Sequence, residues 1–393
     1  MKSNIKLHQI IILIIVTAII SGLASGVIVY SSFNKNAGIS YKTINNDDAL
    51  KQFLEVYSTI NDDYYENIDK TKMIEAAIDG MLKYLDDNYT TYMTKDESNM
   101  LHETLAGEYQ GIGVIIENRT IKSVFENSPA EKAGIQIGDE IIKVNDEDVT
   151  SLDSSAIANK IKTSTDKNIT ISIKRNNEEK RLMLEISTLY IPAISKSIID
   201  GTNIGYLELA TFSSSVTNQV SDALKYFEDK KIDGLIIDLR SNTGGFLSSA
   251  EGVSSLFLKK GKVIYSLESK NSKKEIKDLT KSSTDYPIVV LVNGSTASAA
   301  EIVAAALKDS YGAKIVGTKS YGKGKVQQTI TLSDGSMAKF TSAKWLRPNG
   351  TCIDTKGIEP DYKVELELKK DNDGNITDII DTQLNKAIEL LTT

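Results

Sequence analysis

Three successive patterns of apolar and polar residues divide the chain. Between residues 47 and 105 the pattern is helical, because Leu50, Phe53, Leu54 and Tyr57 are spaced i, i+3, i+4 and i+7. A second apolar stripe of the same kind follows, formed by Ile74, Ala77, Ile78, Met81, Leu82 and Leu85. We predict amphipathic helices here, whose stripes either pack within the chain or pair two copies of it.

From Gly107 to about Ser187 the apolar pattern is that of short strands. Residues 113–117 and 121–125 predict a hairpin around Asn118 and Arg119. Residues 128–134 predict a short helix, with a proline in its first turn and a glycine at its end. The remaining elements expected in this stretch are a strand at 141–144, a helix at 155–161 and two strands at 169–174 and 180–186.

After Pro192, buried strands alternate with helices. The expected strands are 204–209, 235–239, 263–267 and 288–293, and the expected helices are 216–229, 247–258 and one that reaches Lys308 before Gly312. A hairpin is predicted from 326–332 and 337–345. This alternation predicts a layered sheet with helices packed on it. The fold class is therefore α+β and multidomain, with a helical N-terminal region, a β-rich middle and a layered α/β core.

The first 35 residues predict a membrane segment. No charged residue occurs from Gln9 to Asn34, and Lys2 and Lys6 precede this run, which places the N-terminus in the cytoplasm. Residues 24–26 are small and offer a cleavage site for a signal peptidase. Apolar character resumes directly afterwards, which favours an uncleaved single-pass anchor. Under either interpretation, the chain after about residue 35 is extracytoplasmic, and it is secreted if the segment is cleaved.

Composition narrows the function further. A net charge of -7 argues against a nucleic-acid partner, which usually requires a basic face. Cys352 is the single cysteine, which excludes an intramolecular disulfide and a cysteine-rich metal site. We see no cluster of metal-ligating residues along the sequence, and we expect neither a metal nor a cofactor.

Ser298 and Lys323 are the candidate reacting pair. A serine hydroxyl needs a base to become a nucleophile, and the chain has only two histidines, His8 and His102. A Ser-Lys arrangement is therefore the natural candidate. Ser298 precedes an alanine-rich helix, and Glu301 three residues later also fits a capping box, in which the serine only caps the helix.

Lys323 must be neutral to act as a base. Lowering its pKa from about 10.4 to about 7.5 requires burial and costs on the order of 4 kcal/mol. An exposed turn lysine between Gly322 and Gly324 is the alternative interpretation. Gln327 lies on the same face of the expected strand, but about 13 Å away in a regular strand, so contact with Lys323 requires a bend near Gly324.

Backbone amides near Ser298 are candidates for stabilising an oxyanion. Ala299 supplies the first N–H of the expected helix, where such groups have no partner and carry partial positive charge. Gly244 and Gly245 end the segment that begins at Asp238 and leaves a buried strand at a sheet edge. A plain loop between strand and helix is the alternative there.

Taken together, these segments resemble the C-terminal processing (tail-specific) serine peptidases. The resemblance rests on residues 235–245, 295–302 and 321–327, in this order and spacing, and extends from roughly Asp47 to the end. It implies Ser298 as nucleophile, Lys323 as general base and Gln327 as the partner that orients the lysine. It also implies oxyanion donors near Gly244 and Ala299. Thr243 departs from the family, which usually has proline at that position, but no reacting group is missing.

The resemblance also implies a PDZ domain in the strand-rich middle. Its carboxylate-binding loop would be Gly111, Ile112, Gly113 and Val114, whose amides capture a C-terminal carboxylate while the peptide adds as a strand. The domains implied are an anchor or signal segment at 1–35, a helical region at 36–104, the PDZ domain at 105–188, the peptidase core at 189–370 and a C-terminal helix at 371–393. That last helix either pairs subunits in a homodimer or packs on the core.

The function expected from this resemblance is extracytoplasmic peptide-bond hydrolysis. The substrates would be proteins or peptides with free C-termini, which the PDZ domain either delivers or uses to gate the site. An inert scaffold that only binds C-terminal tails is the main alternative, although a scaffold needs no serine, lysine and glutamine at this spacing. An esterase is a third possibility, against which the tail-reading domain argues.

Overall fold

The computed structural model describes residues 47–125, 127–164, 166–190, 192–280, 284–370 and 376–392. The expected membrane segment at 1–35 lies outside these residues. Among the helices that are described, none combines the length and the apolar character needed to cross a bilayer. The described chain divides into two compact units, one built mainly from residues 102–193 and the other mainly from residues 47–101 and 194–392.

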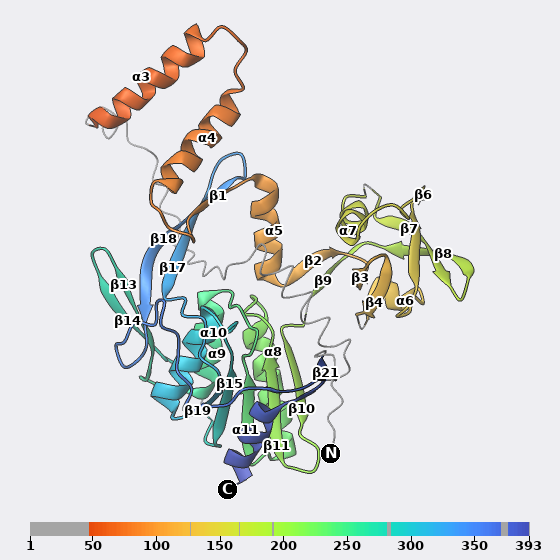
Figure 1. The fold of residues 1–393 in the computed structure, drawn as a ribbon, viewed down its shortest axis with the longest axis vertical. Helices are drawn as coiled ribbons and strands as arrows, with labels where there is room; N and C mark the ends of the chain where they lie inside the picture. The colour runs from red at the N-terminus through yellow and green to blue at the C-terminus, as the bar shows by residue number, and fades with distance from the viewer. Residues whose placement is uncertain are drawn as a thin grey trace. The chain divides into compact units, whose positions relative to one another are not determined.

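The smaller unit is β-rich, as predicted (Figure 1). Its elements are β2 (Glu108–Gly111), β3 (Val114–Glu117), β4 (Thr120–Val124), α6 (Pro129–Lys132), β5 (Glu140–Val144), β6 (Glu147–Asp148), α7 (Ser154–Lys162), β7 (Asn168–Arg175), β8 (Glu178–Glu185) and β9 (Ser187–Tyr190). The main sheet has the order β3-β4-β5-β7-β8, with β6 on β5, and β2 pairs with β9 separately. Fully buried isoleucines from β4, β5, α7 and β7 fill its core.

The N-terminal part of the larger unit is mostly helical. It contains α3 (Asp48–Asp63), α4 (Lys70–Lys83) and β1 (Thr91–Met93), and α5 (Lys95–Ala106) runs from this part of the chain into the smaller unit. Asp47 and Asp69 cap α3 and α4 with their carboxylates. The expectation of helices throughout 47–105 was wrong at β1, whose residues pair antiparallel with residues 337–339, far along the chain.

The central sheet of the larger unit has six strands. In spatial order they are β10 (Ile194–Ile198), β11 (Ile204–Leu209), β12 (Gly234–Asp238), β15 (Ile288–Val292), β16 (Lys314–Gly317) and β19 (Tyr362–Lys363). All neighbours are parallel except β10, which is antiparallel to β11 at the edge. Every residue of β12 and β15 is buried, as expected of parallel strands covered on both faces.

Helices cover this sheet. They are α8 (Val216–Lys230), α9 (Leu247–Phe257), α10 (Ala299–Ala306) with a π-helical turn at Leu307–Tyr311, and α11 (Thr382–Thr392). Ala387 of α11 packs in one cluster with Ile236, Val289 and Leu291 of the sheet, while α10 contacts α9 and α9 contacts α8 (Figure 1). The C-terminal helix thus packs on the core, and its expected role in pairing subunits stays a prediction.

A second sheet has five strands. They are β13 (Val263–Ser269), β14 (Lys273–Lys277), β17 (Lys325–Thr331), β18 (Met337–Leu346) and β1, in the order β1-β18-β13-β14 with β17 paired to β18. A further pair, β20 (Glu367–Lys370) and β21 (Ile376–Ile380), precedes α11. Ile380, expected on the last helix, therefore ends a strand instead. The predicted hairpin is observed as β17 and β18, and it carries both Lys325 and Gln327.

Candidate active site

Ser298 sits at the point where the buried strand β15 is followed by helix α10. It is the N-cap of α10, with φ 60° and ψ -119°, a backbone conformation that a residue with a Cβ rarely adopts. Its side chain is fully buried, and within the described chain its Oγ has no hydrogen-bond partner. A strained backbone and an unpaired buried hydroxyl both cost stability, and such costs concentrate at functional sites.

Glu301 holds the segment of Ser298 and the segment of Lys323 together. Its Oε2 accepts from Ser298 N at 2.8 Å and from Lys323 N at 2.9 Å. Its Oε1 accepts from Ser320 Oγ at 2.5 Å and from Gly322 N at 2.8 Å. Burial raises the pKa of this carboxyl, and the four hydrogen bonds oppose that rise. The glutamate side of the predicted capping box is therefore present, but the same carboxylate also binds a second loop.

Lys323 is buried, with 1% of its surface exposed, so the alternative of an exposed turn lysine does not hold for it. The indole Nε1 of Trp345 donates to Lys323 O at 2.9 Å, so that both the N–H and the carbonyl of Lys323 are held by buried side chains. Gly322 permits this path, because it has φ 91° and a Cβ there would lie 2.7 Å from Gly357 N.

The surroundings of Lys323 favour its neutral form. Burial, and then the positive charge of Lys339, lower the pKa of Lys323 to about 7, although Glu301 and Asp87 act in the opposite direction. Its Nζ lies 4.6 Å from the centre of the Tyr89 ring. A lysine with this pKa is partly unprotonated at neutral pH and can accept a proton.

Gln327 is buried on β17. Its Nε2 donates to Thr341 Oγ1 at 3.2 Å, while its Oε1 is buried and has no partner among the residues that the structure describes. The register of β17 against β18 shifts between Val326 and Gln327. Val326 pairs with Ala343 and Gln327 with Thr341, so the β-bulge has its extra residue, Ser342, on β18. The bend near Gly324 that the sequence had led us to expect stays a prediction.

The loop after β12 lies against Ser298. Gly244 has φ 107°, and a Cβ at this position would lie 2.9 Å from Ser298 Cβ and 3.0 Å from Ala299 N. Asn242 anchors the loop, since its Nδ2 donates to Leu209 O and its Oδ1 accepts from Gly244 N at 2.9 Å. The structure therefore brings Gly244 next to the serine and to the first N–H of α10, with the N–H of Gly244 itself bonded to Asn242.

Comparison with known proteins identifies the family. Residues 203–364 match the model of peptidase family S41, residues 120–175 match a PDZ domain, and residues 28–97 match the N-terminal domain of the activating protease CtpB. The carboxy-terminal processing protease CtpA of Bacillus subtilis (strain 168) is 36% identical over 383 residues, which cover 93% of this chain and 78% of that protein. The chain belongs to peptidase family S41.

Other comparisons agree with this assignment to the S41 peptidases. The carboxy-terminal processing protease CtpB of the same bacterium is 36% identical over 329 residues, covering 81% of this chain and 68% of that protein. The photosystem II D1 C-terminal processing protease shares the fold, with a TM-score of 0.50 at 24% identity, over 92% of this chain and 94% of that one. The predicted fold class, with a PDZ domain and an S41 peptidase core, is confirmed.

In the PDZ domain of this S41 peptidase, the predicted carboxylate loop joins β2 to β3. Ile112 is buried, its carbonyl accepts from Ala130 N at 2.8 Å, and the carbonyl of Gly113 accepts from Phe125 N at 2.9 Å. Gly113 has φ 89°, and a Cβ there would lie 2.3 Å from Ser128 Cβ. The two carbonyls are thus used inside the domain, and carboxylate binding by the amides of this loop stays a prediction.

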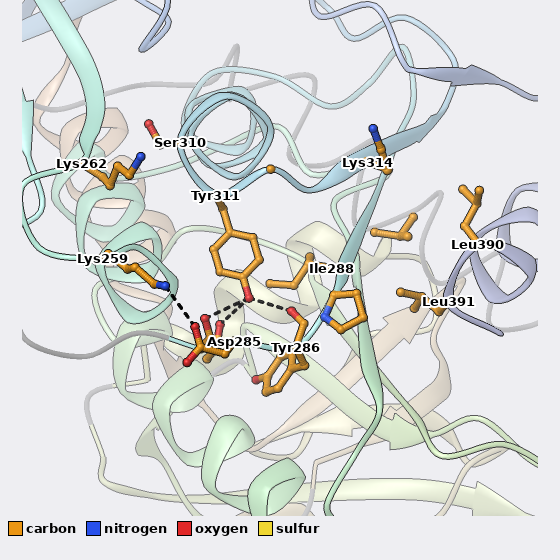
Figure 2. A pocket seen from close by; sticks show the side chains of 14 residues that line it. Lys259, Lys262, Asp285, Tyr286, Ile288, Ser310, Tyr311, Lys314, Leu390 and Leu391 are labelled. Atoms are coloured by element: carbon orange, nitrogen blue, oxygen red, sulfur yellow. Dashed lines mark hydrogen bonds and ion pairs between the residues drawn. The ribbon is translucent and has the colours of Figure 1, made fainter. Parts of the chain in front are cut away.

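A cavity of about 600 Å³ lies where the central strands β15 and β16 begin, at the end of β15 away from Ser298 (Figure 2). It is lined by the first residues of β15 and β16, by Tyr311 and by Leu390 and Leu391 of α11, whereas Ser298 follows the other end of β15. Tyr311 closes one side, donating to Tyr286 O at 2.7 Å. None of the predicted site residues of the peptidase lines this cavity.

The sequence did not reveal several residues that build the site. Glu301 was considered only as a cap, Asn242 only as part of a loop, and Asp87 only as part of the stretch expected to be helical. Asp87 and Thr341 nonetheless connect to Gln327 through hydrogen bonds. The composition of the segment from Asp87 to Tyr92 could have indicated that it belongs to the site. The segment is polar and aromatic, whereas a buried helix would be apolar. Among the described residues, no group of three or more metal-ligating side chains comes together.

Proposed function

We propose that this S41 peptidase cleaves peptide bonds with Ser298 as nucleophile, Lys323 as general base and Gln327 as the partner of the lysine. The observation that carries the proposal is the burial of Lys323, which lowers its pKa to about 7, in a loop that shares the carboxylate of Glu301 with Ser298. A lysine that is partly neutral at physiological pH can take the proton that a serine hydroxyl must lose.

The chemical steps follow from these positions. Lys323 Nζ takes the proton of Ser298 Oγ, and Oγ attacks the carbonyl carbon of the scissile bond. The oxyanion that forms is stabilised by the N–H of Ala299 and by amides of the Gly244–Gly245 turn, among which Gly244 N would first have to leave Asn242. The Lys323 ammonium then protonates the leaving amine, and a water molecule deprotonated by Lys323 hydrolyses the acyl-enzyme. Because Ser298 Oγ has no hydrogen bond to break within the described chain, its side chain can turn towards the lysine.

The substrates we propose are proteins or peptides with a free C-terminus, bound outside the cytoplasm. The carboxylate would bind the amides of Gly111, Ile112, Gly113 and Val114, so that the PDZ domain delivers the substrate or gates the site. Residues 1–35 would anchor the enzyme as a single span, since an uncharged apolar run follows Lys2 and Lys6. Cleavage of that segment would instead release a secreted enzyme, and a homodimer remains part of the proposal.

The test is proteolysis of an unfolded, reduced and carboxymethylated protein by the full chain purified in detergent. We expect Ser298→Ala and Lys323→Ala each to abolish cleavage, by at least about a thousandfold, while circular dichroism shows that both variants are folded. Lys319→Ala is the matched control, because Lys319 is an exposed lysine of the same loop region. Full activity of Lys323→Ala would disprove the base assignment. Binding of tails without any cleavage by the wild type would favour the scaffold.

A further inference from the structure

A chain of hydrogen bonds leads from Gln327 to the partly buried carboxylate of Asp87. Gln327 Nε2 donates to Thr341 Oγ1 at 3.2 Å, and Thr341 Oγ1 donates to Asp87 Oδ2 at 2.5 Å. Asp87 also accepts from Thr90 Oγ1 at 2.7 Å and from Lys325 Nζ at 2.9 Å. Three of these five residues lie on the β17–β18 hairpin, whereas Asp87 and Thr90 come from the segment just before β1.

Asp87 is ionised throughout the range in which a peptidase would work. Burial opposes this, but hydrogen bonds from Thr341, Lys325 and Thr90 lower the pKa of Asp87 to about 2. An ionised carboxylate only accepts hydrogen bonds. The single hydroxyl proton of Thr341 is therefore committed to Asp87, and towards Gln327 the hydroxyl oxygen can act only as an acceptor.

This polarity determines how the Gln327 amide is turned. Only the Nε2 end can satisfy the Thr341 oxygen, so the Oε1 end must point to the other side of the amide. Oε1 is buried there without a partner in the described part of the chain. Burying an amide oxygen without a hydrogen-bond donor costs free energy. A hydrogen bond from a nearby cation with N–H groups would offset that cost.

We propose that Asp87 and Thr341 are positioning residues that hold the Gln327 amide with Oε1 ready to accept a hydrogen bond from the Lys323 ammonium. Neither residue would touch the substrate. Their role would be to exclude the flipped amide, in which the NH₂ group would face the lysine and repel its charged form. This inference rests on the proposed function, since it assigns the support of the same lysine.

Several charged and aromatic groups of the described chain face Lys323. Lys339 from β18, Glu301 from α10, and Asp87 and Tyr89 from the segment before β1 surround it, and Lys325 from β17 lies over the same Tyr89 ring. Loss of the Gln327 acceptor would leave the Lys323 ammonium less stabilised. The pKa of Lys323 would then fall further, and the ammonium formed during proton abstraction would lose its support.

The decisive comparison is Thr341→Val with Thr341→Ser. Valine has the shape of threonine without the hydroxyl, whereas serine retains the hydroxyl. For Thr341→Val we expect the plateau of kcat/KM to fall about tenfold to a hundredfold, the range for one hydrogen bond to a charged group. We also expect the acid limb of the pH profile to move to lower pH by about one unit. Thr341→Ser should restore most of both, and Thr331→Val, an exposed threonine of the same hairpin, should change neither.

A second variant covers the case in which Thr341→Val does not fold. Asp87→Asn combined with Lys325→Met leaves the net charge near Lys323 unchanged but gives position 87 donors as well as an acceptor. Thr341 can then reverse its hydroxyl, and the amide of Gln327 is no longer held in one orientation. We expect the same two changes, in the same direction and smaller.

Labelling of Ser298 by a fluorophosphonate probe, followed against pH, gives a readout that does not depend on any peptide. A wild type that neither cleaves protein nor reacts through Ser298 would disprove the proposed function itself. An active wild type whose Thr341→Val variant has the activity and the pH profile of Thr341→Ser would disprove the positioning role alone. A loss of activity with an unmoved acid limb would also overturn it, because it would show that Thr341 acts only through the fold.

Discussion

At the scale of single residues, the site depends on a lysine that is buried beside another lysine. Burial is the larger cause of the lowered pKa of Lys323, and the charge of Lys339 is the second. Lys339 is itself 4% exposed, and burial lowers its pKa as well. Burial thus disfavours the charged form of both lysines, and the charge of Lys339 adds to this effect at Lys323, which suits a base and costs stability.

Removal of the second charge should therefore make Lys323 easier to protonate. In Lys339→Met the pKa of Lys323 rises, so the acid limb of kcat/KM moves to higher pH and activity at pH 6 falls relative to the wild type. The measurement is a pH profile of kcat/KM between pH 5 and 9. Lys344→Met, an exposed lysine on the same strand, is the control and should leave the limb in place. A limb that stays fixed or moves to lower pH in Lys339→Met would contradict the assignment of this limb to Lys323.

The conformation of Ser298 also belongs to this scale. Its φ of 60° and ψ of -119° could not be read from the sequence, where Ser298 and Glu301 have the spacing of an ordinary capping box. The spacing correctly indicated the contact between Glu301 and the backbone of Ser298. It did not indicate that the hydroxyl would be left unbonded among the described residues, because that depends on the backbone angles of a single residue.

At the scale of elements, the site is a junction between helix α10 and the loop that leads into β17. Glu301 makes this junction with one carboxylate that serves four donors. Glutamine would keep one oxygen and replace the other by an NH₂ group, which faces donors and repels them. The loop of Lys323 and the first turn of α10 would then be held by about half of the present hydrogen bonds.

We expect Glu301→Gln to lower kcat/KM about a hundredfold or more, since two hydrogen bonds to a charged group are lost. The free energy of unfolding should fall by about 2–4 kcal/mol. Both are measurable, by steady-state proteolysis and by urea denaturation. Glu359→Gln changes an exposed glutamate and should leave both values near those of the wild type. Unchanged activity in Glu301→Gln would show that the junction does not position the reacting pair.

The elements predicted well from the sequence are those with a strong local pattern. The β17–β18 hairpin, the buried strands β12 and β15, and helix α8 lie within one or two residues of their predicted bounds. Local pattern failed for β1, whose three residues have no periodicity of their own and become a strand only by pairing with β18. The contacts of Glu301 with Ser320 and Gly322 were missed for the same reason, since residues 19 and 21 positions away meet it only in the folded chain.

At the scale of the whole molecule, the peptidase core and the PDZ domain lie on one chain, and the proposed function joins them through the substrate. The domain boundaries that we drew from the sequence stay predictions. So does the role of the loop from Gly111 to Val114, whose carbonyls are bonded within the domain.

A pair of matched peptides tests this link in the full chain. We expect a peptide with a free C-terminal carboxylate to be cleaved with a kcat/KM about tenfold higher than the same peptide with a C-terminal amide, mainly through KM. The physical reason is that the amide has no charge for the backbone N–H groups to bind. Acetylation of the peptide's N-terminus is the control and should change little. Equal kcat/KM for acid and amide would remove the carboxylate from the recognition step.

The contact between Asp87 and Lys325 joins positions 238 residues apart. During synthesis, Asp87 leaves the ribosome early and the β17–β18 hairpin late. Until then, a nascent chain has Asp87 without the hairpin residues that contact it. The nascent polypeptide would therefore stay inert until the β17–β18 hairpin has been synthesised. Timing of this kind would spare a protease from digesting its own unfinished copies.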